Sequence, residues 1–518
     1  MNRVLRTAPL LFVLALTAVV SARAQRTAAY GDWQLHLPTN HARVLADAGS
    51  RVYVASENSF YALDKETSTI QLLSRRDGLS DVGAREMAFD SLTQQLVVAY
   101  ASGQIDILNA KGRVVASLSD IKRKPMSGKV INRVDVARRR AYVSTNFGIV
   151  VIDLQRYEVR ETYASFGPGG TVPQVYATTV QGDSLYAATN QGLLRGRLSA
   201  NLLDFNNWRT FSGFGARSSD PYRTLVTHQG KVYAGINGDN VYRAVGNGWV
   251  SVGFGANGSL DCRSLRSSAA GLLITEGNRV TALDTRTNRL RSRADGPLLQ
   301  SCLDAIRSES GPLYVADYQN GLIRIEPNGR NPAQFVANAP GSVSVLNIVT
   351  DPVSKTVTVL PGGYRNDYAP EFNQQGFFVY DADGRWTNVN GQTYNTTDFP
   401  DILNLSRGTR TPDGTLYIAS YSGGLLEWKG PGQWRQYREG TPGSPLISAS
   451  PGSPFYTRAT DVAAAPNGDV WVVNRSFPAT GAGIFRFTPS TGTWQAGPIF
   501  SGSENLERIV VDDLGHPW

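Results

Sequence analysis

The clearest feature of this sequence is a short run of apolar, β-favouring residues that recurs eleven times along the chain. The second position of the run is most often aromatic, and successive second positions lie 40 to 59 residues apart. These second positions are Tyr53, Val97, Tyr142, Tyr186, Tyr233, Leu273, Tyr314, Thr358, Tyr417, Trp471 and Trp518. A repeat of this length, built from short strands and Gly-rich turns, predicts the blades of a β-propeller. One blade cannot bury both of its faces alone, so each must pack between two neighbours.

The alternation of apolar and polar positions within one repeat predicts four strands per blade. In the repeat around Tyr417, an inner strand at Leu403–Arg407 leads to a tight turn at Pro412-Asp413-Gly414. Strands then follow at Leu416–Ser420 and Leu425–Trp428, and a Trp-containing outer strand at Gln433–Tyr437 ends the blade. The same pattern elsewhere predicts an all-β protein.

One outer-type strand, Gly31–Leu37 with Trp33, precedes any blade of its own. We expect it to complete the last blade of a first ring and so to hide both free sheet edges. By the same logic Ala333–Val336 opens a second ring. The predicted architecture is tandem β-propellers: a seven-bladed ring over 25–332, and an incomplete ring over 333–518 with three blades and part of a fourth. Because the chain ends inside a repeat, we expect a longer natural protein.

Residues 1–24 have the pattern of a secretory signal peptide. Arg3 and Arg6 form the charged start, Leu10–Val20 the apolar stretch, and Ala22-Arg23-Ala24 a small-residue cleavage site. The apolar stretch is too short for a transmembrane helix, and the mature sequence has no segment that could be one. We expect an exported protein at the cell surface or outer membrane, with the periplasm as intermediate. Its formal charge of +8 drops to about +5 without the leader, too little to indicate nucleic-acid binding.

Two cysteines, Cys262 and Cys302, occupy nearly equivalent places in adjacent repeats. An exported chain reaches compartments in which disulfides form, so a Cys262–Cys302 disulfide is one expectation. Two buried thiols are the other, because neighbouring inner strands can lie beyond disulfide reach.

The sequence offers no catalytic constellation. Its four histidines are never close at metal-ligand spacing, and it has no P-loop, dinucleotide fingerprint or nucleophile elbow. Asp304 and Asp461 share a register in the repeat but belong to different rings, so they do not form the acid pair of a glycosidase. We therefore expect no catalytic residue, no metal site and no cofactor. A polysaccharide-active enzyme is the least favoured alternative.

In a propeller, the loops between second and third strands emerge on the same face as the loops from one outer strand to the next inner strand. The longest insertions of this chain fall in those two kinds of loop, and loops often carry function. We interpret this face as a binding surface; ordinary tolerance of insertions is the alternative. The connection 119–130 on this face contains the basic run Lys122, Arg123 and Lys124, which suits an anionic sugar, a phosphate or an acidic partner. A solvated loop is the other interpretation.

The loop 361–376 lies on the same face and contains Tyr364, Tyr368 and Phe372 among Gly, Pro and Asn residues. Exposed aromatic side chains suit contact with carbohydrate or with a protein partner. Packing of the loop onto its own ring is an equally good explanation.

Specific segments resemble known families. The pattern Asp77–Asp81, then Phe89-Asp90, then Leu96–Tyr100 resembles the propeller repeats of two-component-regulator sensors. The stretch from Trp33–Pro38 through Leu118–Lys124 is similar to the N-terminal part of the PorZ family of the type IX secretion system. So are the two stretches Asn146–Leu154 and Leu185–Gly192.

The PorZ resemblance implies two tandem propellers followed by a C-terminal β-sandwich sorting domain. It implies a non-catalytic adaptor at the cell surface, in an attachment complex with the PorU sortase, PorV and PorQ, that supports cargo anchoring and binds anionic lipopolysaccharide. The alternative is the ectodomain of a two-component sensor, followed by a transmembrane helix and a kinase.

Overall fold

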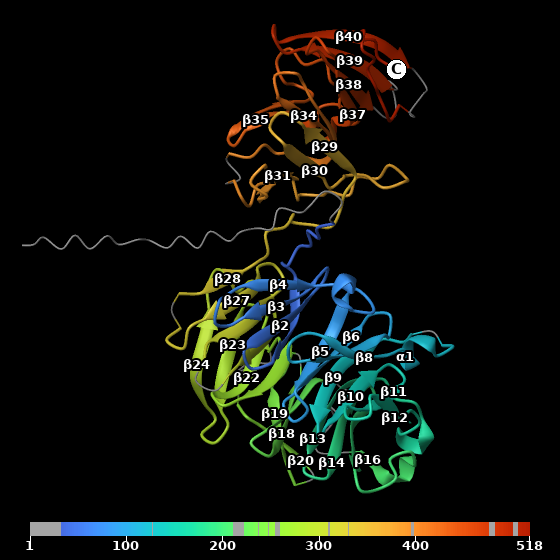
Figure 1. Ribbon diagram of the computed structural model, residues 1–518, viewed down its shortest axis with the longest axis vertical. Coiled ribbons are helices and arrows are strands. Elements are labelled where there is room, and N and C mark those ends of the chain that lie inside the picture. Colours follow the sequence, from blue (N-terminus) through green and yellow to red (C-terminus); the bar gives the residue numbers. More distant parts are fainter. Residues whose placement is uncertain are drawn as a thin grey trace, which may run out of the picture. The chain divides into compact units, whose positions relative to one another are not determined.

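The computed structural model describes residues 33–126, 128–210, 222–236, 238–246, 248–253, 260–308, 311–329, 331–394, 398–475, 482–500 and 506–518. These residues form ten four-stranded antiparallel sheets, each made of four strands that follow one another in the chain (Figure 1). The predicted all-β architecture of tandem propellers is confirmed. The predicted signal peptide, residues 1–24, lies outside the described residues.

The strands of the first seven sheets are β1 (Ala42–Asp47), β2 (Arg51–Ser56), β3 (Phe60–Asp64), β4 (Ile70–Leu73), β5 (Ala84–Asp90), β6 (Gln95–Tyr100), β7 (Ile105–Asn109), β8 (Val114–Leu118), β9 (Ile131–Ala137), β10 (Arg140–Thr145), β11 (Gly148–Asp153), β12 (Glu158–Tyr163), β13 (Val175–Gln181), β14 (Ser184–Thr189), β15 (Gly192–Arg197), β16 (Trp208–Thr210), β17 (Tyr222–His228), β18 (Lys231–Ile236), β19 (Val241–Val245), β20 (Gly248–Ser251), β21 (Ser264–Ser268), β22 (Gly271–Glu276), β23 (Arg279–Asp284), β24 (Arg289–Asp295), β25 (Cys302–Arg307), β26 (Leu313–Asp317), β27 (Gly321–Ile325) and β28 (Ala333–Phe335).

The remaining three sheets consist of β29 (Asn347–Asp351), β30 (Thr356–Leu360), β31 (Phe377–Tyr380), β32 (Trp386–Val389), β33 (Leu403–Arg410), β34 (Leu416–Ser422), β35 (Gly424–Gly430), β36 (Gln433–Tyr437), β37 (Arg458–Ala464), β38 (Val470–Arg475), β39 (Ala482–Thr488) and β40 (Thr493–Phe500). The helical turns in the described part of the chain are α1 (Asp120–Arg123) and the 3-10 turns η1 (Arg75–Asp77), η2 (Pro168–Gly170), η3 (Phe205–Asn207) and η5 (Pro454–Tyr456).

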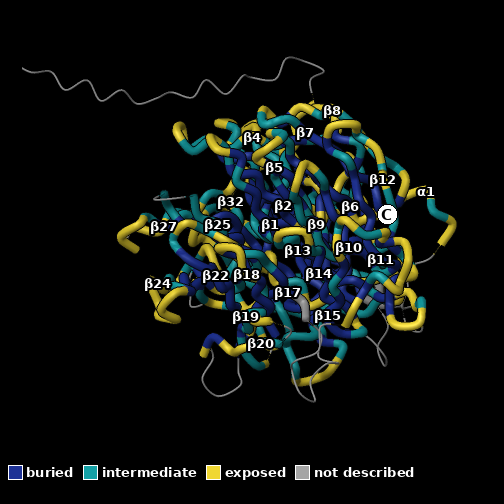
Figure 2. Tube along the Cα trace, turned by 90° about the horizontal axis from the view of Figure 1, so that it is seen from below, coloured by how far each residue is buried: buried dark blue, intermediate teal, exposed yellow. Residues whose placement is uncertain are grey.

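The aromatic residues that mark the repeat form the core between blades. Tyr53, Tyr142, Tyr233, Tyr314 and Tyr417 are each at most 1 % exposed, and the strands around them are buried while the turns are exposed (Figure 2). Each of these tyrosines packs in an apolar cluster with the following blade. Burying such a side chain contributes about 2 kcal/mol, so the repeat pattern is a pattern of interfaces between blades.

The first seven sheets form a closed cycle. The innermost strands β1, β5, β9, β13, β17, β21 and β25 contact one another in that order, and β25 in turn contacts β1. At the closing interface, Leu45 and Tyr61 of the first sheet share an apolar cluster with Tyr314 and Leu322 of the seventh. We call this interface between the first and seventh sheets the seam.

The ring closes without the strand predicted at Gly31–Leu37. Residues 33–40 form no strand, and Trp33 is 83 % exposed, while Gly31 and Asp32 lie outside the described residues. The fourth strand of the seventh sheet is instead β28, which pairs with β27. The prediction that Gly31–Leu37 seals the ring is therefore wrong, and Ala333–Val336 ends the first ring instead of opening the second. The physical reason is loop entropy, because β28 follows β27 after a short connection, whereas Trp33 is far away in the chain.

A buried carboxylate holds the seam together in place of a shared strand. Asp304 on β25 is 2 % exposed and accepts two hydrogen bonds from the Arg266 guanidinium of β21, at 3.0 and 2.6 Å. It also accepts the Ser264 hydroxyl at 2.8 Å and, across the seam, the Leu45 N–H of β1 at 3.1 Å. Burial alone would raise the pKa of Asp304, but Arg266 outweighs it and holds that pKa below its ordinary value. One side chain thus links three inner strands.

Polar side chains also join the first and seventh sheets nearer to their outer strands. The Lys65 ammonium lies 2.6 Å from the Asp47 carboxylate and donates to the Ser308 hydroxyl at 2.9 Å. Farther out, Arg324 of the seventh sheet donates to the Ser68 hydroxyl of the first at 3.1 Å. The seam is therefore tied by side chains along its depth.

The second ring repeats the connection made by Asp304. In it, a polar side chain of each inner strand accepts a backbone N–H from the next inner segment: Asn347 from Gly408 at 3.1 Å, Thr409 from Ala464 at 3.2 Å, and Asp461 from Ile509 at 3.0 Å. Ile509 thus takes the position beside β37 that a fourth inner strand would take. The number of blades that complete this ring stays a prediction.

We expect Asp304→Asn to destabilise the first ring. The amide keeps the side chain's size but leaves the Arg266 charge buried without its counter-ion, which costs about 3 kcal/mol of unfolding free energy. The measurement is urea unfolding at pH 7. Because the folded-state pKa of Asp304 is lowered, its contribution is complete above the ordinary aspartate pKa of about 4 and is lost as the pH falls toward the folded value.

The matched control is Asp295→Asn in the same ring. Asp295 pairs with Arg293 at 2.7 Å, but both side chains are 54 % exposed, so we expect a change below about 0.5 kcal/mol. Equal urea midpoints for the two variants would show that Asp304 does not hold the seam.

Candidate functional site

The basic run predicted at Lys122, Arg123 and Lys124 forms the end of the short helix α1 and the residue after it, in the connection from β8 to β9. The Lys122 ammonium lies 3.2 Å from the Asp81 carboxylate, and the Lys124 ammonium lies 5.4 Å from the centre of the Phe147 ring. Within the described part of the chain, Arg123 is the one of the three whose side chain has no hydrogen bond, ion pair or ring contact. The run is therefore partly used to hold its own loop.

The carboxylate of Asp81, the partner of Lys122, also binds several other neighbouring groups. Its carboxylate accepts the Ser102 hydroxyl at 2.6 Å and the Val82 N–H at 2.9 Å, and it pairs with Arg75 at 3.1 Å. Burial would raise the pKa of Asp81, but Ser102, Val82, Lys122 and Arg75 together hold it well below its ordinary range. The carboxylate stays ionised at any physiological pH and fixes α1 to the preceding blades.

The aromatic loop predicted at 361–376 folds toward its own ring. The rings of Tyr364 and Tyr368 are stacked at 5.9 Å, and the Tyr364 ring lies 4.5 Å from that of Tyr421 on β34. The Tyr421 hydroxyl donates to the Tyr368 carbonyl at 3.1 Å. Phe372 is 52 % exposed, and no aromatic contact ties it to these tyrosines. The structure thus brings together two of the three predicted aromatic residues.

Close backbone packing holds the loop in this position. A Cβ atom on Gly363 would lie 2.4 Å from the Cβ of Asn404, so only glycine fits there. Asn404 is fully buried at a φ of 55°, and it accepts the Asn373 N–H at 2.7 Å. Its amide also donates to the Ser422 hydroxyl at 2.8 Å. The residues that look like a flexible Gly/Asn loop in the sequence are therefore the ones that fix it.

Three arginines from separate strands lie beside these tyrosines or pair with the nearby Glu507. The Arg475 guanidinium lies 3.7 Å from the centre of the Tyr368 ring, and that of Arg458 lies 5.1 Å from the Tyr421 ring. Arg407 pairs with Glu507 at 3.5 Å. We call the following residues the tyrosine–arginine cluster: Tyr364, Tyr368, Tyr421, Arg407, Arg458, Arg475 and Glu507.

Glu507 is the acceptor at the centre of the tyrosine–arginine cluster. It accepts the Tyr364 hydroxyl at 3.1 Å and the Tyr368 hydroxyl at 3.3 Å. Burial and the Glu507 charge raise the pKa of Tyr364 to about 12, so this hydroxyl remains a donor. The Nε atoms of Arg407 and Arg475 are buried without a hydrogen-bond partner in the described part of the chain.

Stacked aromatic rings and guanidinium groups of this kind suit contact with sugars, phosphates and carboxylates. The two acids that share a register serve structure: Asp304 holds the seam, and Asp461 accepts the N–H groups of Ile509 and Val462. Across the described ranges, no three His, Cys, Asp or Glu side chains gather in a way that could hold a metal ion. Nor does any helix there have the length and apolar character needed to cross a bilayer.

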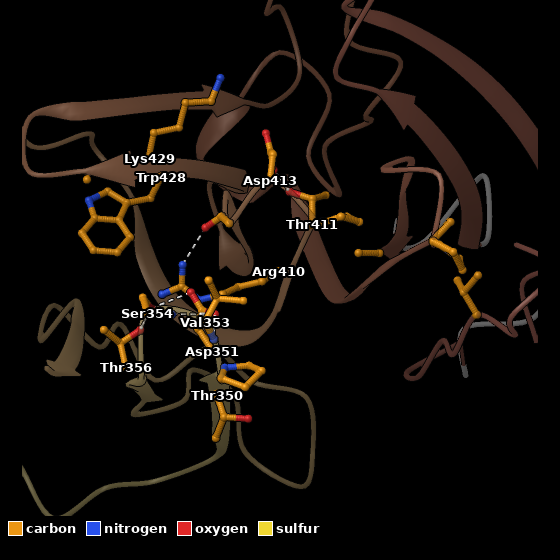
Figure 3. A pocket seen from close by; sticks show the side chains of 18 of the residues that line it. Thr350, Asp351, Val353, Ser354, Thr356, Arg410, Thr411, Asp413, Trp428 and Lys429 are labelled. Carbon is orange, nitrogen blue, oxygen red and sulfur yellow. Dashed lines mark hydrogen bonds between the residues drawn. The ribbon is translucent and has the colours of Figure 1, made fainter. Parts of the chain in front are cut away.

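A cavity of about 820 Å³ lies in the second ring, among the turns that join the first and second strands of its blades (Figure 3). The Arg410 guanidinium points into it but donates to the Gly414 carbonyl at 2.7 Å and to the Thr358 hydroxyl at 3.3 Å. Asp413 accepts hydrogen bonds from Thr411 and Thr415, which lower its pKa. These charges are engaged in turn structure, so we do not assign chemistry to this cavity.

The two cysteines are free thiols in the structure. Cys262 is 2 % exposed, with its sulfur 3.6 Å from the Thr224 hydroxyl, and Cys302 is fully buried, 3.7 Å from the Asp317 carboxylate. Burial raises the pKa of each thiol to about 12. Of the two expectations, the structure has the buried thiols and not the disulfide.

Comparison with known proteins shows what the first propeller is similar to. Residues 52–209 match the family model described as the N-terminal β-propeller domain of PorZ from the type IX secretion system. Over these residues the chain is similar to the PorZ N-terminal propeller domain. The match covers the blades that carry Asp81 and α1. No curated protein matches the sequence.

Among solved structures, PorZ of Porphyromonas gingivalis superposes with a TM-score of 0.75 at 21 % identity, over 92 % of this chain. That protein is described as an essential bacterial surface component of the type IX secretion system of a human oral bacterium. The chain spans 62 % of the length of that PorZ. The likeness establishes that the fold over both rings is of the PorZ type.

Two looser matches are the WD40 propeller of Doa1, with a TM-score of 0.41 at 13 % identity, and the extracellular domain of BT4673 from B. thetaiotaomicron, with 0.31 at 13 %. The first covers 56 % of this chain and 93 % of the other, and the second 92 % and 62 %. Scores of this size carry no functional argument, so they do not favour the sensor ectodomain.

We expect Cys262 and Cys302 to be unreactive in the folded protein. A thiol pKa of about 12 leaves almost no thiolate at pH 8, and the thiolate is the nucleophile. A colorimetric thiol reagent should report no thiol in the native protein and two thiols after unfolding in guanidinium without reductant. No thiol after unfolding would mean that the two are oxidised.

We expect Gly363→Ala to release the 361–376 loop. The added Cβ would meet the Asn404 backbone, which cannot move because it is held on both sides. Chymotrypsin should then cleave after Tyr364 or Tyr368 about ten times faster than in the unaltered protein. Gly248→Ala, where the nearest atom is 3.9 Å away, is the control. Identical cleavage of the two variants would contradict this account of the loop.

Proposed function

We propose that this protein is a non-catalytic surface component of a type IX secretion system. The observation that carries the proposal is the PorZ family match at 52–209, on a chain whose fold follows that of a solved PorZ over 92 % of its length. That PorZ is described as a surface component of the type IX secretion system. The leader pattern in residues 1–24 agrees with export.

More specifically, we propose an adaptor of the attachment complex that includes the PorU sortase, PorV and PorQ and that anchors secreted cargo. A propeller suits this role because its rigid rings present many loops on one face. The engaged acids Asp81, Asp304 and Asp461 support binding over catalysis, since each is committed to several hydrogen bonds.

The proposed ligand is anionic lipopolysaccharide. Two features of the described chain support this: the exposed Arg123 beside Lys122 and Lys124 on α1, and the three guanidinium groups of the tyrosine–arginine cluster. Arginine pairs well with phosphate and carboxylate oxygens.

The adaptor role is tested by affinity capture of the tagged full-length protein from a cross-linked outer-membrane fraction. We expect PorU, PorV and PorQ in the eluate and not in that of an untagged strain. Capture without any of the three would overturn the assignment to the attachment complex.

The lipopolysaccharide role is tested with the variant Lys122→Gln, Arg123→Gln, Lys124→Gln. We expect its affinity for immobilised anionic lipopolysaccharide to drop about tenfold, and the affinity of the unaltered protein to weaken with salt, because the contact is electrostatic. The control is Arg138→Gln with Arg139→Gln, in the turn between β9 and β10 on the other face. An equal loss in both variants would indicate a general charge effect and not a site on α1.

A further inference from the structure

A second cavity lies among the inner strands of the first ring. It has a volume of about 370 Å³. Its lining is mostly charged and comprises Arg43, Val44, Arg85, Glu86, Arg133, Asp261, Cys262, Arg263, Leu303 and Asp304. Four guanidinium groups and three carboxylates therefore share a space that is large enough for a small organic molecule or the end of a chain.

The backbone explains why arginines face this space. The pairing register of β1 shifts between Ala42 and Val44, and that of β5 shifts between Ala84 and Glu86. Such a β-bulge leaves one extra residue unpaired and re-aims its side chain. The extra residues are Arg43 and Arg85, so the same irregularity in two blades turns a guanidinium toward the channel.

Most charges of this cavity are already paired. Arg43 lies 3.1 Å from the Glu57 carboxylate, and Arg263 lies 2.9 Å from that of Asp261. Asp304 is held by Arg266 at the seam.

Arg85 and Arg133 are different. Neither side chain has a hydrogen bond or an ion pair with any residue that the structure describes, and both residues line the cavity. Arg133 is half-buried, and burial together with the Arg266 charge lowers its pKa. Two guanidinium groups thus face a confined space in which Glu86 is the one unpaired carboxylate of the lining.

Glu86 is the group whose charge changes near neutrality. Burial raises its pKa to about 7; Asp304 of β25 adds to the rise, while Arg133 of β9, Arg266 of β21 and Arg85 oppose it. The other charged groups around it are Arg43 of β1, Asp261 and Arg263 before β21, and Asp135 of β9, whose pKa burial raises to about 6. When Glu86 takes up a proton, the cavity gains one unit of positive charge.

We propose that this cavity binds an oxyanion, a carboxylate or a sulfate-like or phosphate group, through Arg85 and Arg133, and that Glu86 makes the binding stronger as the pH falls. The proposal is independent of the proposed function, because it concerns a different ring position and a different set of residues. The group can belong to a free small anion or to an acidic sugar at the end of a glycan, and both present the same oxygens to the arginines.

The test is isothermal titration of the full chain with sodium sulfate and with glucuronate, neither of which titrates between pH 6 and pH 8. We expect binding about ten times tighter at pH 6 than at pH 8, because that is the change in the protonated fraction of a group with a pKa of about 7. Binding of both probes assigns a general anion site, and binding of glucuronate alone assigns an acidic sugar end. Binding of neither overturns the proposal.

Four variants distinguish binding at this site from a general effect of charge. Glu86→Gln should bind at pH 8 as the unaltered protein binds at pH 6, a gain that a misfolded protein cannot produce. Arg85→Gln, at an exposed position, should weaken binding at least fivefold, and Arg209→Gln on the outer strand β16 should leave it unchanged. Asp135→Asn should keep the dependence on pH. A Glu86→Gln protein that binds like the unaltered one at every pH would refute the role of Glu86.

Discussion

The first ring depends on how its two chain ends are joined, and Asp304 is the group that joins them. A blade stack with an open side would expose two apolar sheet faces, so the seam must be as firm as any other interface between blades. Tyr314 and Leu45 supply the apolar part of the seam, as in the other interfaces. Asp304 fixes how the inner strands are placed relative to one another, because its carboxylate accepts hydrogen bonds from both neighbouring inner strands at once. A buried ion is costly unless it is fully paired, and here Arg266 and two further donors pair it.

The repeat, the four-strand blade and the tandem arrangement could all be predicted from the sequence, because they follow from local alternation and from one spacing. The way in which the first ring closes could not be predicted. Trp33 lies in a stretch that looks like the outer strands around Trp208 and Trp434, yet it forms no strand. Alternation indicates that a segment can form a strand but not which strand it pairs with. Here Ala333–Phe335 pairs with β27, because the connection between them is short.

The candidate site, too, could be predicted from the sequence only in part. Composition indicated Tyr364 and Tyr368, because aromatic residues in a Gly- and Asn-rich loop stand out. It could not indicate Arg458 or Arg475, which lie in ordinary strand patterns and meet the tyrosines only in the folded ring. Nor could the basic run reveal that Lys122 is engaged by Asp81, since the two residues lie 41 positions apart in the chain.

On the inner strands, residues that join neighbouring blades lie beside residues that face the channel. Asp304 and Asp461 each follow a register shift, and each bonds the backbone of the next inner segment. In the first ring, the bulged residue just before Asp304 is Leu303, which lines the channel instead. In the second ring, the hydroxyl of Thr460, just before Asp461, donates to the Leu506 carbonyl at 3.2 Å and so adds to the contact. A change at a bulged position of the first ring, such as Leu303, can therefore alter the channel without removing the contact that Asp304 makes. Arginine at such positions in β1 and β5 gives the first ring a charged channel, while its closure still rests on Asp304, because closure and channel chemistry use different residues of the same strand.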